Sequence, residues 1–295
     1  MKYRHRYHAG NFADVHKHVA LLALLQALQH KERGLLYVET HAGAGSYDLT
    51  DATTHRGAEA RQGVLALLGA PVLQAAELQA YRRAIDAWHH DHGESRSYPG
   101  SPVLAARALR PQDRAVLCEL LPAECRALER SLAGLRRARI LCQDGYAALS
   151  ASLPPPERRA LVLIDPPYEQ PPQEIEQALA AVRLVLGRLA NAVIALWYPI
   201  KDERWLSSWQ ARIASQIGAP VTTLELWLYP RDARVALNGS GLLLVNPPYR
   251  FEEAARTWQG ELRAVLERAR PAAAPPGGDA VRVLVSEQEA GHADA

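Results

Sequence analysis

The aliphatic run Leu161 to Ile164 is the clearest signal of a buried strand in the chain. Such a run, with no polar alternation, is typical of a strand covered on both faces in a parallel sheet. Asp165-Pro166-Pro167-Tyr168 follows at once, and its prolines cannot continue a hydrogen-bonded ladder. The sequence therefore predicts Asp165 at the carboxyl end of a central strand, the edge where open α/β sheets bind ligands.

Further aliphatic runs alternate with helical patterns along most of the chain. The predicted strands cover residues 35–40, 115–120, 138–142, 161–164, 192–196, 221–228 and 241–245. Strands that alternate with helices imply an α/β fold, here a mostly parallel seven-stranded sheet with helices on both faces. The last two strands follow each other closely enough to form a hairpin, and residues 281–285 offer a short edge strand.

Residues from about 47 to 113 fit this alternation badly, so we expect a mostly helical insertion after the first strand. A polar loop is predicted at its end, and the histidines His89, His90 and His92 fall on this loop. Neighbours on a loop seldom share one metal ion, so we predict no metal site. The whole is expected to be one domain over residues 1–285, followed by a disordered tail at 286–295.

Amino-acid composition alone does not show which class of partner the protein binds. The chain has 295 residues with 34 Lys and Arg against 32 Asp and Glu, a net charge of +2, which does not by itself identify a nucleic-acid partner. Basic residues are nevertheless concentrated in the first 33 positions, and this segment fits either a phosphate-contacting arm or a solvated terminus.

Cysteine use and hydropathy point to the cytoplasm. Cys118, Cys125 and Cys142 are odd in number and lack a Cys-x-x-Cys spacing, as expected of reduced thiols. The apolar run over residues 19–28 is too short to span a membrane, and no small-residue cleavage site follows it. We therefore predict a helix from about residue 11 to 30 in a soluble cytoplasmic protein.

The strand-end groups suit one reaction, methylation of the exocyclic amine of adenine. This amine is a poor nucleophile because its lone pair is delocalised into the ring. The Asp165 carboxylate and the Pro166 carbonyl can accept its two hydrogens and turn the lone pair toward an electrophilic methyl group. Tyr168 can stack on the base. The alternative is that Asp-Pro-Pro only ends a strand and opens a turn.

Two other strand ends carry groups suited to a nucleotide-like cofactor. Gly43 and Gly45 allow a tight turn after the first strand, although a lone Gly-x-Gly is weak support. Glu119 ends the second strand, where an acid takes ribose hydroxyls, and Asp144 follows the third, where it can receive an adenine amine. Asn246, in a second Pro-Pro-Tyr motif, ends the last strand and is predicted to be structural.

Several blocks of sequence together resemble a known family. They are Tyr3-Arg4-His5, His8-Ala9-Gly10-Asn11, Ala13-Asp14-Val15, Lys17-His18, Thr40-His41-Ala42-Gly43-Ala44-Gly45, Tyr98-Pro99-Gly100-Ser101-Pro102, Asp144-Gly145, Asp165-Pro166-Pro167-Tyr168, Ala195-Leu196-Trp197-Tyr198-Pro199 and Asn246-Pro247-Pro248. The chain is similar to Rossmann-like S-adenosylmethionine-dependent methyltransferases and, more narrowly, to the RlmJ family of bacterial adenine-N6 methyltransferases acting on 23S ribosomal RNA.

This resemblance implies roles for individual residues. The residues implied to contact S-adenosylmethionine are His18, His41, Ser101, Glu119, Asp144 and Gly145. Asp165 is implied as the catalytic acceptor, and Tyr3 and Lys17 as residues on the substrate side. We expect the N-terminal arm to close over the site. The expected protein is a monomeric enzyme that methylates N6 of an adenine in 23S ribosomal RNA, without a membrane or a metal; a DNA adenine methyltransferase and a non-catalytic nucleic-acid-binding protein are the alternatives.

Overall fold

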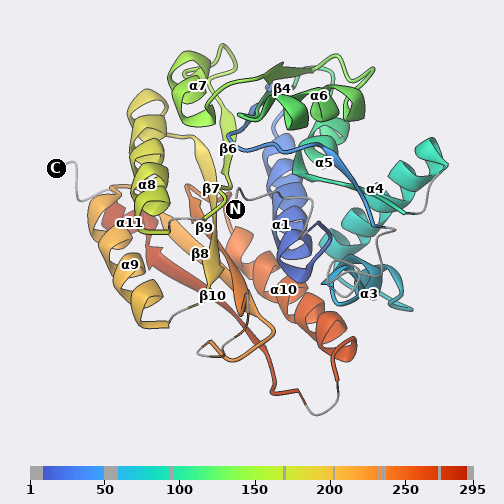
Figure 1. Ribbon diagram of the computed structural model, residues 1–295. Coiled ribbons are helices and arrows are strands. Elements are labelled where there is room, and N and C mark those ends of the chain that lie inside the picture. The colour runs from blue at the N-terminus through green and yellow to red at the C-terminus, as the bar shows by residue number, and fades with distance from the viewer. Residues whose placement is uncertain are drawn as a thin grey trace.

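The computed structural model describes residues 9–49, 59–93, 96–168, 171–201, 203–231, 233, 235, 237–271 and 274–290. Its main sheet consists of β1 Leu36–Glu39, β4 Arg114–Cys118, β5 Ala138–Leu141, β6 Ala160–Ile164, β7 Val193–Ile200, β8 Val221–Trp227, β9 Gly239–Val245 and β10 Gly278–Val285. These strands lie in the order β10-β8-β9-β7-β6-β1-β4-β5 (Figure 1).

The sheet has eight strands, so the predicted count of seven was wrong. The additional strand is β10, which pairs antiparallel with β8 at the edge of the sheet. Most of its residues are only partly buried, and Asp279 and Arg282 interrupt its valines, so its hydrophobic pattern is weak in the sequence. The predicted α/β class and helix-covered, mostly parallel centre are confirmed.

Five neighbouring strands, β7, β6, β1, β4 and β5, run in parallel. β1 pairs in parallel with both β4 and β6, β5 extends the sheet beyond β4, and β7 extends it beyond β6. After β1 the chain adds β4 and β5 on one side of β1, and it then returns to the other side of β1 with β6. This reversal makes the carboxyl ends of β1 and β6 the switch point of the sheet, where ligands are expected.

β8 and β9 form the predicted hairpin, and β9 runs antiparallel to β7. The start of β9 therefore lies at the edge where β7 ends, since Gly239 is opposite Ile200. As a consequence, the β8–β9 connection sits at the same edge of the sheet as Asp165, whereas the end of β9 lies at the opposite edge.

Helices cover both faces of the sheet (Figure 1). They are α1 Phe12–Gln29, α3 Val64–Leu68, α4 Ala76–His92, α5 Ser101–Ala108, α6 Pro122–Ser131, α7 Gly145–Ser152, α8 Pro171–Arg188, α9 Glu203–Gln216, α10 Phe251–Arg268 and α11 Glu287–Ala290. One apolar core joins α1, α3, α4, α5 and α10 to one face, and a second joins α7, α8 and α9 to the other.

Helix α1 is buried along most of its length. Of its 18 residues, 13 are buried, including the charged pair Asp14 and Lys17. The helix begins at the N-cap Asn11, whose side chain accepts a hydrogen bond from the Asp14 amide, and ends at His30. It therefore runs through the interior from one edge of the sheet to the other.

The insertion after β1 contains α3, α4 and a short antiparallel pair of strands, β2 Ser46–Asp48 with β3 Ser97–Pro99. Helix α4 continues to His92, so the predicted loop around His89, His90 and His92 was wrong. The helix stops at Gly93, which adopts φ +64°, a conformation that favours glycine and ends helices. Among the described residues, no three His, Cys, Asp or Glu side chains cluster as a metal site requires.

The C-terminal tail, predicted as disordered, begins with the one-turn helix α11 at residues 287–290. In the part of the chain that the structure describes, every helix is too short or too polar to cross a bilayer.

Candidate active site

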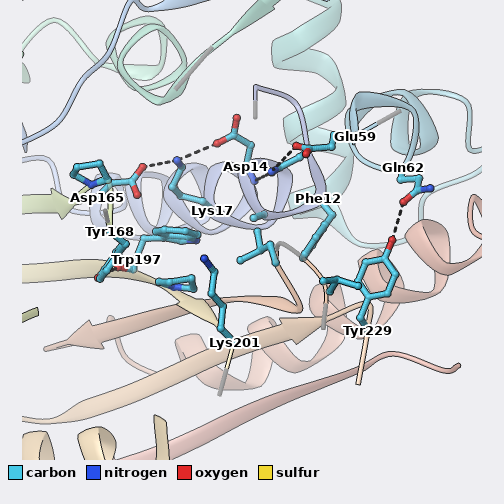
Figure 2. A pocket seen from close by; sticks show the side chains of 16 residues that line it. Phe12, Asp14, Lys17, Glu59, Gln62, Asp165, Tyr168, Trp197, Lys201 and Tyr229 are labelled. Carbon is cyan, nitrogen blue, oxygen red and sulfur yellow. Dashed lines mark hydrogen bonds and ion pairs between the residues drawn. The ribbon is translucent and has the colours of Figure 1, made fainter. Parts of the chain in front are cut away.

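Asp165 lies just beyond β6 and is held by a lysine from α1. All five residues of β6 are buried, and Asp165 is the first polar group after them. Its Oδ2 is 2.5 Å from Nζ of Lys17, and the same ammonium is 3.0 Å from Oδ1 of Asp14 (Figure 2). One cation thus bridges two carboxylates at the switch point.

Burial makes this bridge strong. Lys17, Asp14 and Asp165 expose only 3, 4 and 9 % of their side chains. Burial alone would lower the pKa of Lys17, but the carboxylates of Asp165 and Asp14 outweigh it and raise the pKa above its ordinary value. Lys17 is therefore a permanent cation that fixes the position of the Asp165 carboxylate.

A cavity of about 250 Å³ opens beside this bridge. Lys17 and Asp165 form one end, and Tyr168 and Trp197 contribute aromatic walls (Figure 2). The two rings meet edge to face with centroids 5.6 Å apart, and the Tyr168 hydroxyl donates to the Trp197 carbonyl at 2.5 Å. Tyr168 adopts φ +52°, which aims its ring back into the fold. Aromatic and apolar side chains thus line much of the cavity, and the Lys17–Asp165 ion pair closes one end.

The outer rim of the cavity is built from two distant parts of the chain. Tyr229, from the β8–β9 connection, donates to Gln62 of the insertion at 3.2 Å (Figure 2). Lys201, the exposed residue after β7, lines the same rim. The insertion and the hairpin thus meet across the opening of the cavity.

The glycine turn after β1 is tied to the end of β4. The Gly43 amide donates to Oε2 of Glu119 at 2.9 Å, and the Leu121 amide donates to its Oε1 at 2.7 Å. Gly43 and Gly45 have φ values of +64° and +83°, so both positions favour glycine. A Cβ on Gly43 would lie 2.4 Å from the Tyr47 hydroxyl. The structure thus places Gly43 and Glu119 together, and their predicted contact with a cofactor stays a prediction.

Glu39, at the end of β1, is a site residue that the sequence analysis missed. Its carboxylate is fully buried and accepts hydrogen bonds from Ser101 at 2.5 Å and Tyr37 at 2.8 Å. Burial raises its pKa to about 7, although both hydrogen bonds and Lys17 lower it. The signal was present, because Glu39 is an acid at the end of a buried strand, like Glu119 and Asp144. Ser101 is thereby connected to the switch point.

The start of α7 closes the other side of the turn. Asp144 is its exposed N-cap and accepts from the Tyr146 amide at 2.8 Å. Gly145 packs so closely on β1 that a Cβ would lie 2.0 Å from the Thr40 carbonyl oxygen. His41 packs edge to face on Tyr146, with centroids 5.2 Å apart. Burial lowers the pKa of His41, and the fields of Asp165 and Asp144 oppose that shift.

The other predicted site residues are His18, Pro166 and Tyr3. His18 is fully buried one turn from Asp14, and its Nδ1 is 2.8 Å from the Tyr98 hydroxyl, which is itself 3.0 Å from the Tyr81 hydroxyl. His18 thus belongs to a polar chain behind the cavity. Pro166 is buried between Asp165 and the cavity wall. Tyr3 and the rest of the arm predicted to close lie outside the described residues.

The second Pro-Pro-Tyr motif lies far from this site. Asn246 follows β9, at the opposite edge of the sheet, and its amide nitrogen donates to the carbonyls of Ala190 and Ala192 at 2.8 and 2.9 Å. These bonds hold a strand end in place. The predicted structural role of Asn246 agrees with this position.

Comparison with known proteins gives one consistent family. Residues 32–273 match the family described as ribosomal RNA large subunit methyltransferase D, RlmJ. The chain is 34 % identical to ribosomal RNA large subunit methyltransferase J of Escherichia coli, over 86 % of this chain and 89 % of that protein. It is also 34 % identical to the protein of the same name from Haemophilus influenzae, over 85 % and 89 % of the two chains.

A solved structure extends the similarity to the fold. Protein LPL1258 from Legionella pneumophila superposes with a TM-score of 0.83 at 31 % identity, over 94 % of this chain and 98 % of that one. The agreement spans the insertion as well as the sheet.

Proposed function

The chain belongs to the RlmJ family of ribosomal RNA large subunit methyltransferases, and on this premise we propose that it transfers a methyl group from S-adenosylmethionine to the N6 amine of an adenosine in 23S ribosomal RNA. The observation that carries the proposal is the position of Asp165. Its buried, lysine-held carboxylate stands where β6 ends, between the glycine turn and a cavity with aromatic walls.

The residues around the glycine turn fit a nucleoside donor. Gly43 and Gly145 let the turn and the start of α7 pack tightly, because a Cβ on either would collide with Tyr47 or Thr40, and Glu119 and Asp144 present carboxylates on either side of the turn. Ser101 and His41 complete the proposed donor side, and His18 supports it from behind. When bound, S-adenosylmethionine supplies the electrophilic methyl group.

On the substrate side, the chain orients the amine. The Asp165 carboxylate and the Pro166 carbonyl accept one hydrogen each, which turns the nitrogen lone pair out of conjugation. Tyr168 forms the wall on which the flipped adenine rests. The proton that leaves the amine passes to Asp165 or to solvent.

Lys17 positions this carboxylate. Asp14, on the same helix, holds the Lys17 ammonium in place. The ammonium therefore keeps its contact with the Asp165 carboxylate. The rim formed by Tyr229, Gln62 and Lys201 lies where the flanking nucleotides would pass.

The decisive experiment measures methyl incorporation from labelled S-adenosylmethionine into protein-free 23S RNA and into duplex DNA, followed by nucleoside analysis. Wild type is expected to label N6-methyladenosine in RNA alone. Asp165→Ala is expected to lower the rate at least about a hundredfold, since it removes an acceptor acting on the transition state. Affinity for S-adenosylhomocysteine, measured by calorimetry, should not change.

The other outcomes each favour a different activity. Label in DNA alone would keep the mechanism and replace the substrate. Donor binding without label in either nucleic acid would favour a binding protein. Transfer that persists in Asp165→Ala would refute the assignment of this carboxylate.

A further inference from the structure

A second, larger cavity lies at the opposite edge of the sheet from Asp165. It encloses about 680 Å³ and is bounded by the end of α1, the starts of β6 and β7, and the turn from β9 into α10. The residues that line it include His30, Lys31, Arg159, Asn246, Tyr249 and Arg250. No step proposed above uses any of them.

The turn displays an aromatic ring to solvent. Tyr249 is 87 % exposed, more than any other large hydrophobic side chain in the described part of the chain. Pro247 and Pro248 stiffen the turn, and Asn246 and Arg250 on either side adopt φ values of +51° and +57°. Tyr168 in the first Pro-Pro-Tyr motif is buried, so the same motif holds its ring inward at one edge and outward at the other. An exposed, rigidly mounted ring is a platform for stacking.

Basic side chains outnumber acidic ones beside this ring: Lys31, Arg159 and Arg250 line the cavity with one acid, Glu77. A second acid, the exposed Glu32, lies between Lys31 and Arg33 in the chain. Arg159 donates to the main-chain carbonyls of Leu28 at 2.5 Å and Arg33 at 2.7 Å, so its charge is not neutralised by these contacts. Lys31 and Arg33 are exposed beside it. The nearby acids Asp113 and Glu157 are engaged by Arg110 and Arg114, and Glu253 by Arg250. Burial, and after it Arg110 and Arg33, lowers the pKa of Arg159, while Asp113 raises it.

We propose that Lys31, Arg33, Arg159 and Tyr249 form a second RNA-binding surface, the distal surface, which holds a single-stranded part of the substrate RNA away from the target adenosine. An unpaired base stacks on Tyr249, and the basic side chains contact the phosphates beside it. This inference rests on the proposed RNA substrate.

The path of α1 sets the separation of the two surfaces. Lys17 lies at the catalytic cavity and His30 caps the same helix at the distal surface. At ~1.5 Å per residue these positions are about 20 Å apart, which corresponds to about six nucleotide steps of ~3.4 Å along a stacked strand. A short hairpin carrying only the target adenosine and its closing stem therefore reaches one surface, and a longer RNA reaches both.

The test compares these two RNAs in binding experiments with the full chain. The probes are protein-free 23S RNA and a short hairpin around the adenosine located by nucleoside mapping. Tyr249→Ala is expected to weaken binding of 23S RNA roughly five- to a hundredfold, the range found for loss of one stacked base. Tyr249→Phe, which keeps the ring, should restore it. Hairpin affinity should not change in either variant.

Charge reversal tests the basic side chains separately. The double variant Lys31→Glu/Arg33→Glu should lower the salt dependence of 23S RNA binding, with the slope of log Kd against log salt falling by about 1 to 2. Arg183→Glu, on the outer side of α8 where Arg183 contacts Gln216, is the matched control and should leave both RNAs unaffected. Affinity for S-adenosylhomocysteine verifies that each variant is folded.

Unchanged 23S RNA binding in Tyr249→Ala would overturn the distal surface, as would an equal loss for 23S RNA and hairpin. A concentration-dependent dimer that Tyr249→Ala abolishes, with RNA binding intact, would also overturn it and assign the ring to a second copy of the chain. If wild type binds and methylates no RNA, the proposed function itself fails, and this outcome is distinct from a failure confined to the variants.

Discussion

Glu39 is the residue whose environment differs most from what its sequence position indicates. It is a fully buried acid that shares hydrogen bonds with Ser101 and Tyr37, and its pKa rises to about 7. An ordinary glutamate in the unfolded chain titrates near pH 4.5. Folding thus favours the protonated form, and the site changes its charge near neutral pH.

This shift predicts a pH-dependent stability. The contribution of Glu39 is fully present below pH 4.5 and is lost as pH rises through about 7, because the folded state then has to ionise a buried group. Glu39→Gln removes the ionisation. We expect the free energy of unfolding of the variant, relative to wild type, to rise by up to roughly 3 kcal/mol between pH 5 and pH 8.5. Urea denaturation across this range checks it, and a pH-independent difference would contradict it.

The bridge made by Lys17 predicts a coupled loss. Lys17→Met leaves Asp14 and Asp165 buried without their cation, which should lower the free energy of unfolding by roughly 3 kcal/mol or more. Adding Asp14→Asn removes one of the two stranded charges and should recover part of this loss. Urea denaturation of both single variants and the double variant measures the coupling. Strictly additive effects would show that the ammonium does not bridge the carboxylates.

At this scale, the sequence reveals strand-end acids but not their partners. Asp165, Glu119 and Asp144 are predictable because each follows a recognisable strand. The contact between Lys17 and Asp165 joins residues 148 positions apart, and only the packing of α1 against the sheet creates it. His18 illustrates the same limit, since nothing local indicates its burial against Tyr98.

At the scale of elements, the approach of α7 to β1 depends on one residue. Gly145→Ala would place a Cβ 2.0 Å from the Thr40 carbonyl oxygen and push the helix start away from the glycine turn. We expect affinity for S-adenosylhomocysteine to fall by roughly tenfold to a hundredfold, the effect of ~1 Å of misplacement in a binding site.

Gly187→Ala is the matched control for this change. Gly187 lies within α8, and a Cβ there would meet nothing within 4 Å. Alanine is the better helix former, so this variant should gain about 0.5–1 kcal/mol of stability and bind the donor product like wild type. Equal donor binding by both variants would show that the close packing of Gly145 has no role in binding.

The elements of the sheet centre were predictable, and those at its margin were not. Buried runs such as Leu161 to Ile164 leave few alternatives to a parallel strand. β10 and the β2–β3 pair are short or half-exposed, so whether these segments form strands depends on the neighbours they pair with. The loop predicted at His89, His90 and His92 was wrong because the last turn of α4 is polar and histidine-rich, and Gly93 rather than hydrophobic periodicity ends the helix.

At the scale of the molecule, the structure divides the sheet into a parallel part that carries the site and an antiparallel part, β8 to β10, that supports it. Deleting residues 278–295 removes β10 and its ion pair between Asp279 and Arg263, and exposes the edge of β8. We expect the unfolding midpoint to fall by roughly 5–10 °C, since 1 kcal/mol corresponds to about 2–4 °C at this size. Scanning calorimetry measures this change.

The same truncation should spare the site. None of its residues lies on β10, so affinity for S-adenosylhomocysteine at low temperature should equal that of wild type, while the exposed β8 edge promotes aggregation on warming. Loss of donor binding in a truncated chain that is still folded would show that the two parts of the sheet are not separable in this way.

Helix α1 is a single unbroken rod with Lys17 near one end and His30 at the other. A rigid helix that shifts along its axis moves both ends by the same distance. An axial shift of α1 would therefore change the structure at both edges of the sheet together. If a ligand at one end displaced the helix, linkage would require the coupling between the two ends to be equal in both directions. A fluorescent label beside His30 would therefore report, from outside the catalytic cavity, whether Lys17 has left Asp165.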